Sequence, residues 1–264
     1  MNMNNIIIFD TETTGSGPKD LLCQLAYKTL GEKEITIVYA NPEFPIPFEA
    51  MATHHITQKM VDNEPAFKDN PAYQNIKSMF ENPEIIAVAH NAPFDVKILQ
   101  NDGINTATWL DTCKVATHTK KYHNAERVGL QYLRYFFGIE ISISEATPHS
   151  AEGDVIILEK IFIKLRDIIM EQEGKTEDEA IAEMLVLTHK PVMIEMINFG
   201  KYKGRKVLDV AVEDKRYLQW LYDEKLKATD RDETDWLRTL ERALGITPAP
   251  TQLFSANDYP EIDF

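Results

Sequence analysis

The stretch that decides the fold is IIIFDTETTG, Ile6 to Gly15. Four apolar residues in a row are typical of a strand buried on both faces of a sheet. Side chains alternate between the faces of a strand, so Asp10 and Glu12 point to the same face. Two carboxylates beside a core are costly unless a cation lies between them. The stretch therefore predicts a cation site or, as the plainer alternative, two solvated acids in a turn that ends the strand.

Strand-like and helix-like segments alternate over the first two thirds of the chain. The predicted strands are 6–12, 23–30, 34–40 and 85–90, and the predicted helices are 56–61, 72–80, 94–101, 130–137 and 148–170. Three strands in antiparallel order followed by strand–helix units predict an α/β fold, a mixed sheet flanked by helices. Thr176 and Glu179 form a capping box, which predicts a further helix that reaches His189.

Composition changes along the chain predict its division into parts. We expect a domain at 1–171, a linker helix at 172–191, a small C-terminal module at 192–246 and a flexible tail at 247–264. The tail is expected to be flexible because TPAPTQLFSANDYPEIDF contains three prolines and three acids but no Lys or Arg.

The bulk composition narrows the class of protein. The chain has 264 residues and a net charge of −14, which argues against a nonspecific electrostatic coat on nucleic acid. No signal peptide and no apolar run of membrane-spanning length are evident, so we expect no membrane partner. The two cysteines, Cys23 and Cys113, resemble neither a disulfide framework nor a metal site, which favours a reduced, cytoplasmic setting.

Two later stretches supply further ligand-type residues. VAHNAPFDVKIL places Asp95 after a predicted strand, at the start of a helix. PHSAEGDVIILEKIF places His149 five residues before Asp154, which is about 1.4 helical turns, near the start of the longest predicted helix. These residues could converge with Asp10 and Glu12 at the ends of one strand and two helices.

The three motifs DTETTG, HNAPFD and His-x-x-x-x-Asp, in this order, resemble the exonuclease blocks of the DEDDh 3′–5′ exonucleases. These enzymes form part of the DnaQ-like, ribonuclease-H-like superfamily, and the chain is most similar to its exonuclease X branch. The resemblance covers roughly residues 5–170. The stretch 198–221, with FGKYKG and YLQWL, is also similar to the C-terminal piece of exonuclease X-like chains.

The resemblance implies a metal-dependent 3′–5′ exodeoxyribonuclease that hydrolyses phosphodiester bonds at DNA 3′ ends, releases 5′-mononucleotides and acts in DNA repair or replication. It implies two Mg²⁺ or Mn²⁺ ions, and oxygen-only ligands suit these hard cations. The implied metal-binding residues are Asp10, Glu12, Asp95 and Asp154, with Asp95 acting mainly through water. His149 is the implied general base, and the dipole of the helix that follows would keep it neutral.

The resemblance also implies substrate contacts, each with a plainer alternative. The turn of Thr13, Thr14 and Gly15 would meet the 3′-hydroxyl end, or is an ordinary turn. Phe94 would stack on a base, although a core position is the better interpretation. His54, His55 and Ile56 match a family segment that often reads His-Gly-Ile, and His55 stands where glycine is common, which affects the pocket's shape. Asp111 is interpreted as a helix cap.

Two basic runs are the predicted phosphate contacts, with a solvated face as the alternative. One runs from Lys114 to Arg127. The other lies in the module and consists of Lys201, Lys203, Arg205 and Lys206.

The sequence leaves several alternatives open. A 3′–5′ exoribonuclease, a polymerase proofreading subunit and a noncatalytic nucleic-acid-binding subunit fit the same motifs. The enzyme could prefer single-stranded DNA or act on both single- and double-stranded DNA. The tail segment TQLF, 251–254, faintly resembles peptides that dock on sliding clamps.

Overall fold

A computed structural model describes residues 5–141, 151–228 and 233–247 of the chain. The described residues fall into two units, one reaching Thr188 and one starting at His189. No helix among these residues is both long enough and apolar enough to span a membrane.

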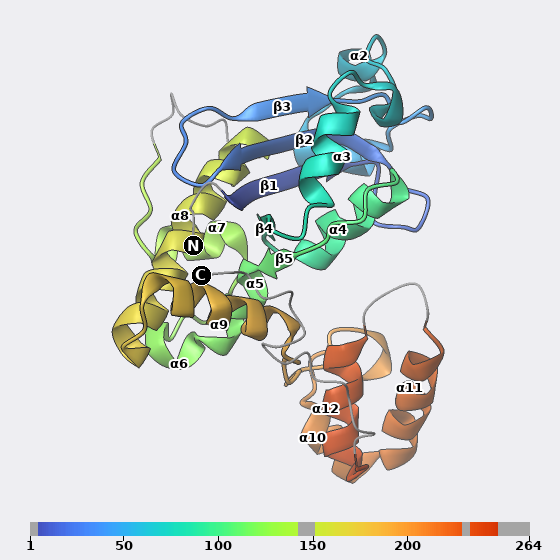
Figure 1. Cartoon of the computed structure of the whole chain (residues 1–264). Helices are drawn as coiled ribbons and strands as arrows, with labels where there is room; N and C mark the ends of the chain where they lie inside the picture. The colour runs from blue at the N-terminus through green and yellow to red at the C-terminus, as the bar shows by residue number, and fades with distance from the viewer. Residues whose placement is uncertain (1–4, 142–150, 229–232, 248–264) are drawn as a thin grey trace. The chain divides into compact units, whose positions relative to one another are not determined.

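A mixed five-stranded sheet forms the centre of the first unit, as far as the structure describes it (Figure 1). Its order is β3-β2-β1-β4-β5, and the strands are β1 (Ile6–Thr13), β2 (Leu22–Thr29), β3 (Thr36–Tyr39), β4 (Ile86–Ala89) and β5 (Trp109–Asp111). β1 pairs antiparallel with β2 and parallel with β4, and β4 pairs parallel with β5. This arrangement confirms the predicted mixed sheet.

Helices flank the sheet of the first unit (Figure 1). They are α1 (Phe48–His54), α2 (Gln58–Val61), η2 (Phe67–Asp69), α3 (Tyr73–Phe80), α4 (Ala92–Asn101), α5 (Thr112–His118), α6 (Lys120–His123), α7 (Leu130–Phe136), α8 (Ala151–Glu173) and α9 (Glu177–His189). The predicted helices at 72–80, 94–101 and 130–137 match α3, α4 and α7 within two residues at each end. The sequence prediction missed α1, α5, α6 and β5.

The alternation of side chains along β1 divides the core into two layers. Ile6 and Ile8 pack on one face of the sheet in the cluster that contains α8. Ile7 and Phe9 pack on the other face, in the cluster that contains α3 and α4. Figure 1 shows α8 on the opposite side of the sheet from these two helices. Because Asp10 and Glu12 continue the series of Ile6 and Ile8, they face α8.

A buried ion pair fixes α8 to the sheet. Lys28 Nζ on β2 lies 2.6 Å from Glu159 Oε2, and both side chains are almost fully buried. The other carboxylate oxygen of Glu159 accepts a 2.8 Å hydrogen bond from the Gly31 backbone N–H. Breaking such a pair by removing one partner leaves a buried charge, which is strongly destabilising. The pair therefore anchors α8, whose first turn carries Asp154, to the sheet.

Helix α9 begins with the predicted capping box. The Thr176 backbone N–H and hydroxyl both donate to Glu179 Oε2, at 2.8 Å each. The segment 172–191, predicted as a linker helix, contains α9, nearly all of which belongs to the first unit. Ile181, Met184 and Leu185 of α9 are buried in the α8 cluster, because the helix presents an apolar face that covers it.

The second unit consists of η3 (Gly200–Tyr202), α10 (Val207–Glu213), α11 (Lys215–Lys227) and α12 (Thr234–Leu244) in its described part. Its core contains Val210, Leu218 and Leu240, one from each α-helix. A bridge between Met196 and Lys206 closes the loop before α10. This small core is separate from the clusters of the first unit.

Candidate active site

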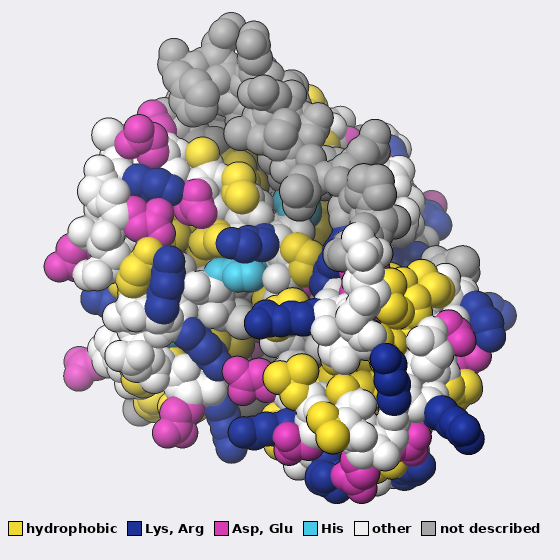
Figure 2. Space-filling model, turned by 90° about the horizontal axis from the view of Figure 1, so that it is seen from below, with side chains coloured by type: hydrophobic (Ala, Val, Ile, Leu, Met, Phe, Trp, Pro, Cys, Tyr) yellow, Lys and Arg dark blue, Asp and Glu magenta, His cyan; other side chains and the backbone are white. Residues whose placement is uncertain are grey.

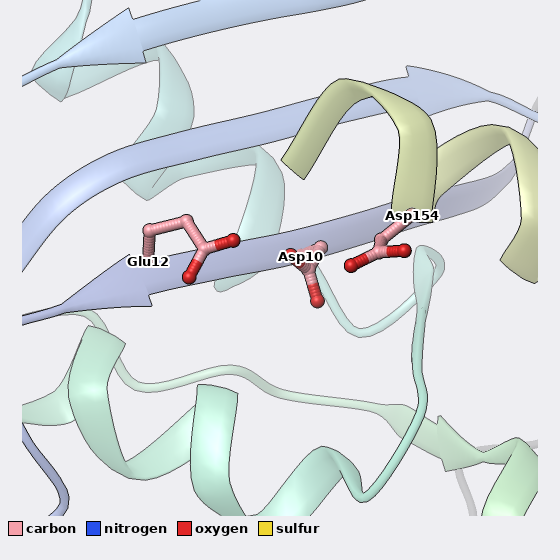
Figure 3. Close-up of side chains that lie close together, drawn as sticks. All are labelled: Asp10, Glu12 and Asp154. Atoms are coloured by element: carbon pink, nitrogen blue, oxygen red, sulfur yellow. The ribbon is translucent and has the colours of Figure 1, made fainter. Parts of the chain in front are cut away.

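Three carboxylates from β1 and α8 meet on the α8 side of the sheet. Asp10, Glu12 and Asp154 each offer one oxygen atom, and these oxygens lie within 4.8 Å of one another. Figure 3 shows the Asp154 carboxylate next to that of Asp10, with Glu12 further along the same strand. The spacing follows from the fold, because the two strand residues share a face and Asp154 lies in the first turn of α8.

The electrostatics of this cluster favour a bound cation. Burial raises the pKa of Asp10 well above its usual range, and Asp95, Glu12 and Asp154 raise it further. Burial, followed by Asp154 and Asp95, raises the pKa of Glu12 to about 8. Such shifts mean that the charged forms repel one another and are poorly hydrated. A cluster of carboxylate oxygens is the donor set of a hard divalent cation, so these residues fit Mg²⁺ or Mn²⁺.

Asp95 is held beside this cluster through Thr11. The Thr11 backbone N–H and hydroxyl donate to Asp95 Oδ1 at 3.0 and 2.6 Å. The pairing of β1 with β4 ends at Ile8. Asp95 therefore accepts the hydrogen bond of the Thr11 backbone N–H, which a carbonyl of a longer β4 would otherwise accept. Burial raises the pKa of Asp95 to about 7, although the two bonds from Thr11 oppose the shift. Among the described residues Asp95 lies outside the three-oxygen group.

One residue of the site escaped sequence reasoning. Gln131 Nε2, in the first turn of α7, donates a 2.8 Å hydrogen bond to Asp154 Oδ1. A glutamine in the sequence LQYL carries no recognisable signal. Only the packing of α7 against α8 brings it to the carboxylate.

The turn after β1 is held mainly by its own polar groups. Thr13 Oγ1 donates to the Gly15 carbonyl at 2.7 Å, and Thr14 Oγ1 donates to Asp20 Oδ1 at 2.7 Å. A Cβ atom at Gly15 would lie 2.7 Å from Asp20 Oδ2, so the turn packs closely at this glycine. Both hydroxyls therefore donate within the turn.

The structure distinguishes the two neighbouring histidines. His54 is buried, and its Nε2 lies 3.2 Å from the Thr13 carbonyl oxygen while its Nδ1 accepts from the Ile56 N–H. His55 is exposed and ends α1 with a φ of 62°, in the left-handed region that favours glycine. His54 therefore contacts the turn beside the cluster, whereas the role of the exposed His55 as a substrate contact stays a prediction.

The other predicted residues have varied placements. Phe94 is half-buried and packs against the α3–α4 core, as in the plainer interpretation. Asp111 caps α5 by accepting from the Cys113 N–H at 2.9 Å, which confirms its structural role. His149 and the TQLF segment lie outside the described residues.

The predicted phosphate contacts of the module are partly neutralised. Lys201 Nζ lies 3.0 Å from Asp214 Oδ2, and Arg205 lies 2.6 Å from Glu213 Oε2. Lys203 is exposed. On the face of the molecule drawn in Figure 2, basic, acidic and hydrophobic side chains are interspersed. Because Lys201 and Arg205 are in ion pairs, their charges are less available to phosphate than the charge of Lys203.

Each of the two units matches a different protein family. Residues 7–162 match the exonuclease family, and residues 197–225 match the family described as exodeoxyribonuclease X-like C-terminal. Exodeoxyribonuclease 10 of Escherichia coli (strain K12) is 29% identical over 188 residues, which are 69% of this chain and 74% of the relative. A DNA polymerase III subunit epsilon-like protein of Rhodobacter capsulatus is 32% identical over 171 residues, 60% of this chain and 23% of that protein.

Solved structures confirm the ribonuclease-H-like fold. Exonuclease X in complex with 5′ overhanging duplex DNA matches with a TM-score of 0.51 and 24% identity, over 69% of this chain and 99% of that one. Exonuclease I matches with a TM-score of 0.54 and 14% identity, over 92% of this chain and 67% of that one. The family match spans more than half of the sequence and contains Asp10, Glu12 and Asp154, which confirms the predicted enzyme class, a 3′–5′ exonuclease. The chain belongs to the exonuclease family.

Proposed function

We propose that this enzyme is a metal-dependent 3′–5′ exodeoxyribonuclease that releases 5′-mononucleotides from DNA 3′ ends. The observation that carries the proposal is the convergence of Asp10, Glu12 and Asp154 inside the region that matches the exonuclease family. DNA is the favoured substrate because the relative in Escherichia coli is named an exodeoxyribonuclease and the second unit matches an exodeoxyribonuclease X-like family. Its setting would be DNA repair or replication in the cytoplasm.

The residues of the cluster have distinct proposed roles. Asp10, Glu12 and Asp154 would hold two divalent cations, Mg²⁺ or Mn²⁺, with Asp10 shared between them. When bound, these ions supply positive charge beside the attacking and the leaving oxygen. Asp95 would contribute through water, since Thr11 already occupies one of its oxygens. His149 would accept the proton of the attacking water.

The substrate end would lie against the turn after β1. Thr13, Thr14 and Gly15 would offer backbone groups to the 3′-terminal nucleotide, and His54 supports this turn from behind through the Thr13 carbonyl. His55 is exposed next to it and would face the nucleotide. Phe94 is assigned to the core rather than to a base.

The two units would have different roles, hydrolysis and strand binding. We assign hydrolysis to the domain at 1–171, extended by the α9 residues that complete its core. We assign strand binding to the module at 192–246, through the exposed members of its basic run, with the tail at 247–264 as a separate segment.

A digestion panel tests the proposal. The full chain is incubated with 5′-labelled and 3′-labelled oligonucleotides, single- and double-stranded, of DNA and of RNA, with Mg²⁺, Mn²⁺ or EDTA. We expect a ladder from 5′-labelled DNA, immediate release of the terminal nucleotide from 3′-labelled DNA, and no cleavage in EDTA. Preferential digestion of RNA would favour the exoribonuclease alternative. Binding without cleavage under every condition would favour a noncatalytic subunit.

A further inference from the structure

Helix α7 presents aromatic side chains to solvent. Tyr135 is 74% exposed, Phe136 43% and Tyr132 36%. The rings of Tyr132 and Phe136 are stacked, with centroids 6.1 Å apart and an interplanar angle of 13°. A cluster of exposed aromatic rings on a protein surface commonly marks a binding site. We call Tyr132, Arg134, Tyr135 and Phe136 the α7 platform.

The α7 platform is continuous with the candidate active site. Gln131, which donates to Asp154, precedes Tyr132 directly and lies one helical turn before Tyr135. Residues four apart in a helix lie on the same side, about 6 Å apart along the axis. A chain whose end lies at Asp10 and Asp154 would therefore meet the platform within a few nucleotides.

The platform also carries a cation that has no acidic partner among the described residues. The guanidinium of Arg134 lies 5.2 Å from the centroid of the Tyr135 ring. It is in no ion pair with any residue that the structure describes, and its Nε is buried with no hydrogen-bond partner. In a chain with a net charge of −14, such an arginine is suited to an anion such as a phosphate.

One residue of the first basic run packs against the same surface. His123, the last residue of α6, packs edge-on against the rings of Phe136 and Phe137, with centroids 6.1 and 5.6 Å away. Lys121 and Arg127 on either side of it are exposed. Aromatic rings interleaved with basic side chains are the combination that binds single-stranded nucleic acid.

We propose that the α7 platform binds the single strand of DNA that leads to the 3′ end held in the active site. Bases stack on Tyr135 and on the Tyr132–Phe136 pair, and Arg134 contacts a phosphate. A single strand fits because its bases expose their faces, whereas those of a duplex are already stacked on one another. The inference rests on the proposed function, since it takes DNA as the substrate.

A substitution series at Tyr135 tests the stacking. The variants are Tyr135→Trp, Tyr135→Phe, Tyr135→Leu and Tyr135→Ser, and the high exposure of the side chain makes each compatible with folding, which circular dichroism verifies. For each full-length variant the KM is measured with single-stranded DNA of two and of ten nucleotides in Mg²⁺. The ratio of these two constants reports the contribution of the strand beyond the active site.

Stacking predicts that Trp and Phe keep the ratio near the wild-type value, whereas Leu and Ser raise the KM of the longer strand by roughly tenfold relative to the shorter one. Leu retains apolar area but has no ring, so a Leu variant that behaves like Phe would overturn the proposal. An unchanged ratio in all four variants would also overturn it, while cleavage by the wild type would leave the proposed function intact.

Two further measurements separate the remaining explanations. Arg134→Gln should flatten the dependence of binding on salt by about 0.7 in logarithmic slope, as expected for the loss of one phosphate contact. Analytical ultracentrifugation compares the wild type with Tyr135→Ser without DNA. A dimer of the wild type that dissociates in the variant would mean that the α7 platform binds a second copy of the chain, which would overturn the proposal.

Discussion

The side-chain amide of Gln131 lies 2.8 Å from Asp154 Oδ1 and joins the first turn of α7 to the first turn of α8. The bond fixes the orientation of a carboxylate that the fold places beside Asp10 and Glu12. Side chains that orient a metal ligand in this way commonly contribute a factor of about 10–100 to metal affinity. Gln131 is therefore a positioning residue, which acts through Asp154.

The first prediction is that Gln131→Leu weakens metal binding. The variant keeps the side-chain volume but removes the donor, so Asp154 loses its fixed orientation. We expect the Mn²⁺ affinity, measured by isothermal titration calorimetry without substrate, to fall by about tenfold, and the Mg²⁺ concentration for half-maximal activity to rise in parallel.

Gln219→Leu is the matched control for this variant. Gln219 Nε2 also donates to an aspartate, Asp223, at 3.1 Å, but this pair lies on the surface of α11. The control should bind Mn²⁺ like the wild type. Equal affinities in the wild type and in Gln131→Leu would assign Gln131 to the packing of α7 alone.

The second prediction concerns the metal cluster itself. Asp10→Asn or Glu12→Gln should reduce nuclease activity to background, because each removes a ligand charge. Without metal, the free energy of unfolding should stay equal or rise, since the amide cannot ionise and adds no charge to the buried cluster. Mg²⁺ should raise the melting temperature of the wild type but not that of either variant, because only a site that binds the ion is stabilised by it.

Differential scanning fluorimetry in EDTA and in excess Mg²⁺ measures this difference. The exposed Glu84→Gln is the control for the loss of one negative charge, and it should respond to Mg²⁺ like the wild type. Full activity in Asp10→Asn would show that the carboxylate cluster is not the catalytic site.

The site could be predicted from the sequence only where its geometry is local. The alternation along β1 is enough to place Asp10 and Glu12 on one face, and the burial of Ile6 and Ile8 under α8 determines which face it is. The contribution of Asp154 required a family resemblance, because it comes from more than 140 residues away in the sequence.

The missed features depend on tertiary contacts. β5 has three residues, Trp109 to Asp111, and is too short to show an alternating pattern, so only its pairing with β4 defines it. The burial of His54 and the exposure of His55 depend on the left-handed turn at the end of α1, which the sequence does not reveal. Gln131 was missed for the same reason, since its partner lies on another helix.

The third prediction is a pH dependence of the metal-free protein. The pKa of Glu12 is raised from an ordinary value of 4.5 to about 8, so at neutral pH the folded state holds a proton that the unfolded state has released. Stability must then fall as the pH rises towards 8, by about 1 kcal/mol per pH unit. Asp95, with a pKa of about 7, acts in the same direction over the lower part of this range.

Urea unfolding in EDTA between about pH 7 and about pH 8 measures this slope. His90 does not disturb the slope in this window. Burial lowers its pKa to about 4, so its protonation destabilises the fold only at lower pH. Glu12→Gln should flatten the slope, and so should Mg²⁺, which stabilises the charged carboxylates. A wild-type slope of zero in EDTA would contradict the raised pKa of Glu12.

The basic run of the second unit contains two kinds of side chain. Lys201 pairs with Asp214, which also accepts from the Tyr202 hydroxyl at 2.8 Å and caps α11. Arg205 pairs with Glu213. Lys203 and Lys206 are exposed, and neither is in an ion pair with another residue in the part of the chain that the structure describes. Surface ion pairs are weak, but each one neutralises the charge that a phosphate would meet.

The last prediction compares two double variants that remove the same formal charge from this run. Lys203→Gln with Lys206→Gln should weaken the binding of single-stranded DNA and lower the logarithmic salt slope by about 1.4, which is the loss of two phosphate contacts. Lys201→Gln with Arg205→Gln should change the slope less, because those cations are already paired, and should instead lower the melting temperature of the second unit. Fluorescence anisotropy in EDTA at several salt concentrations gives both slopes without cleavage. Equal slopes in the wild type and in the Lys203/Lys206 variant would mean that these lysines only keep the second unit hydrated.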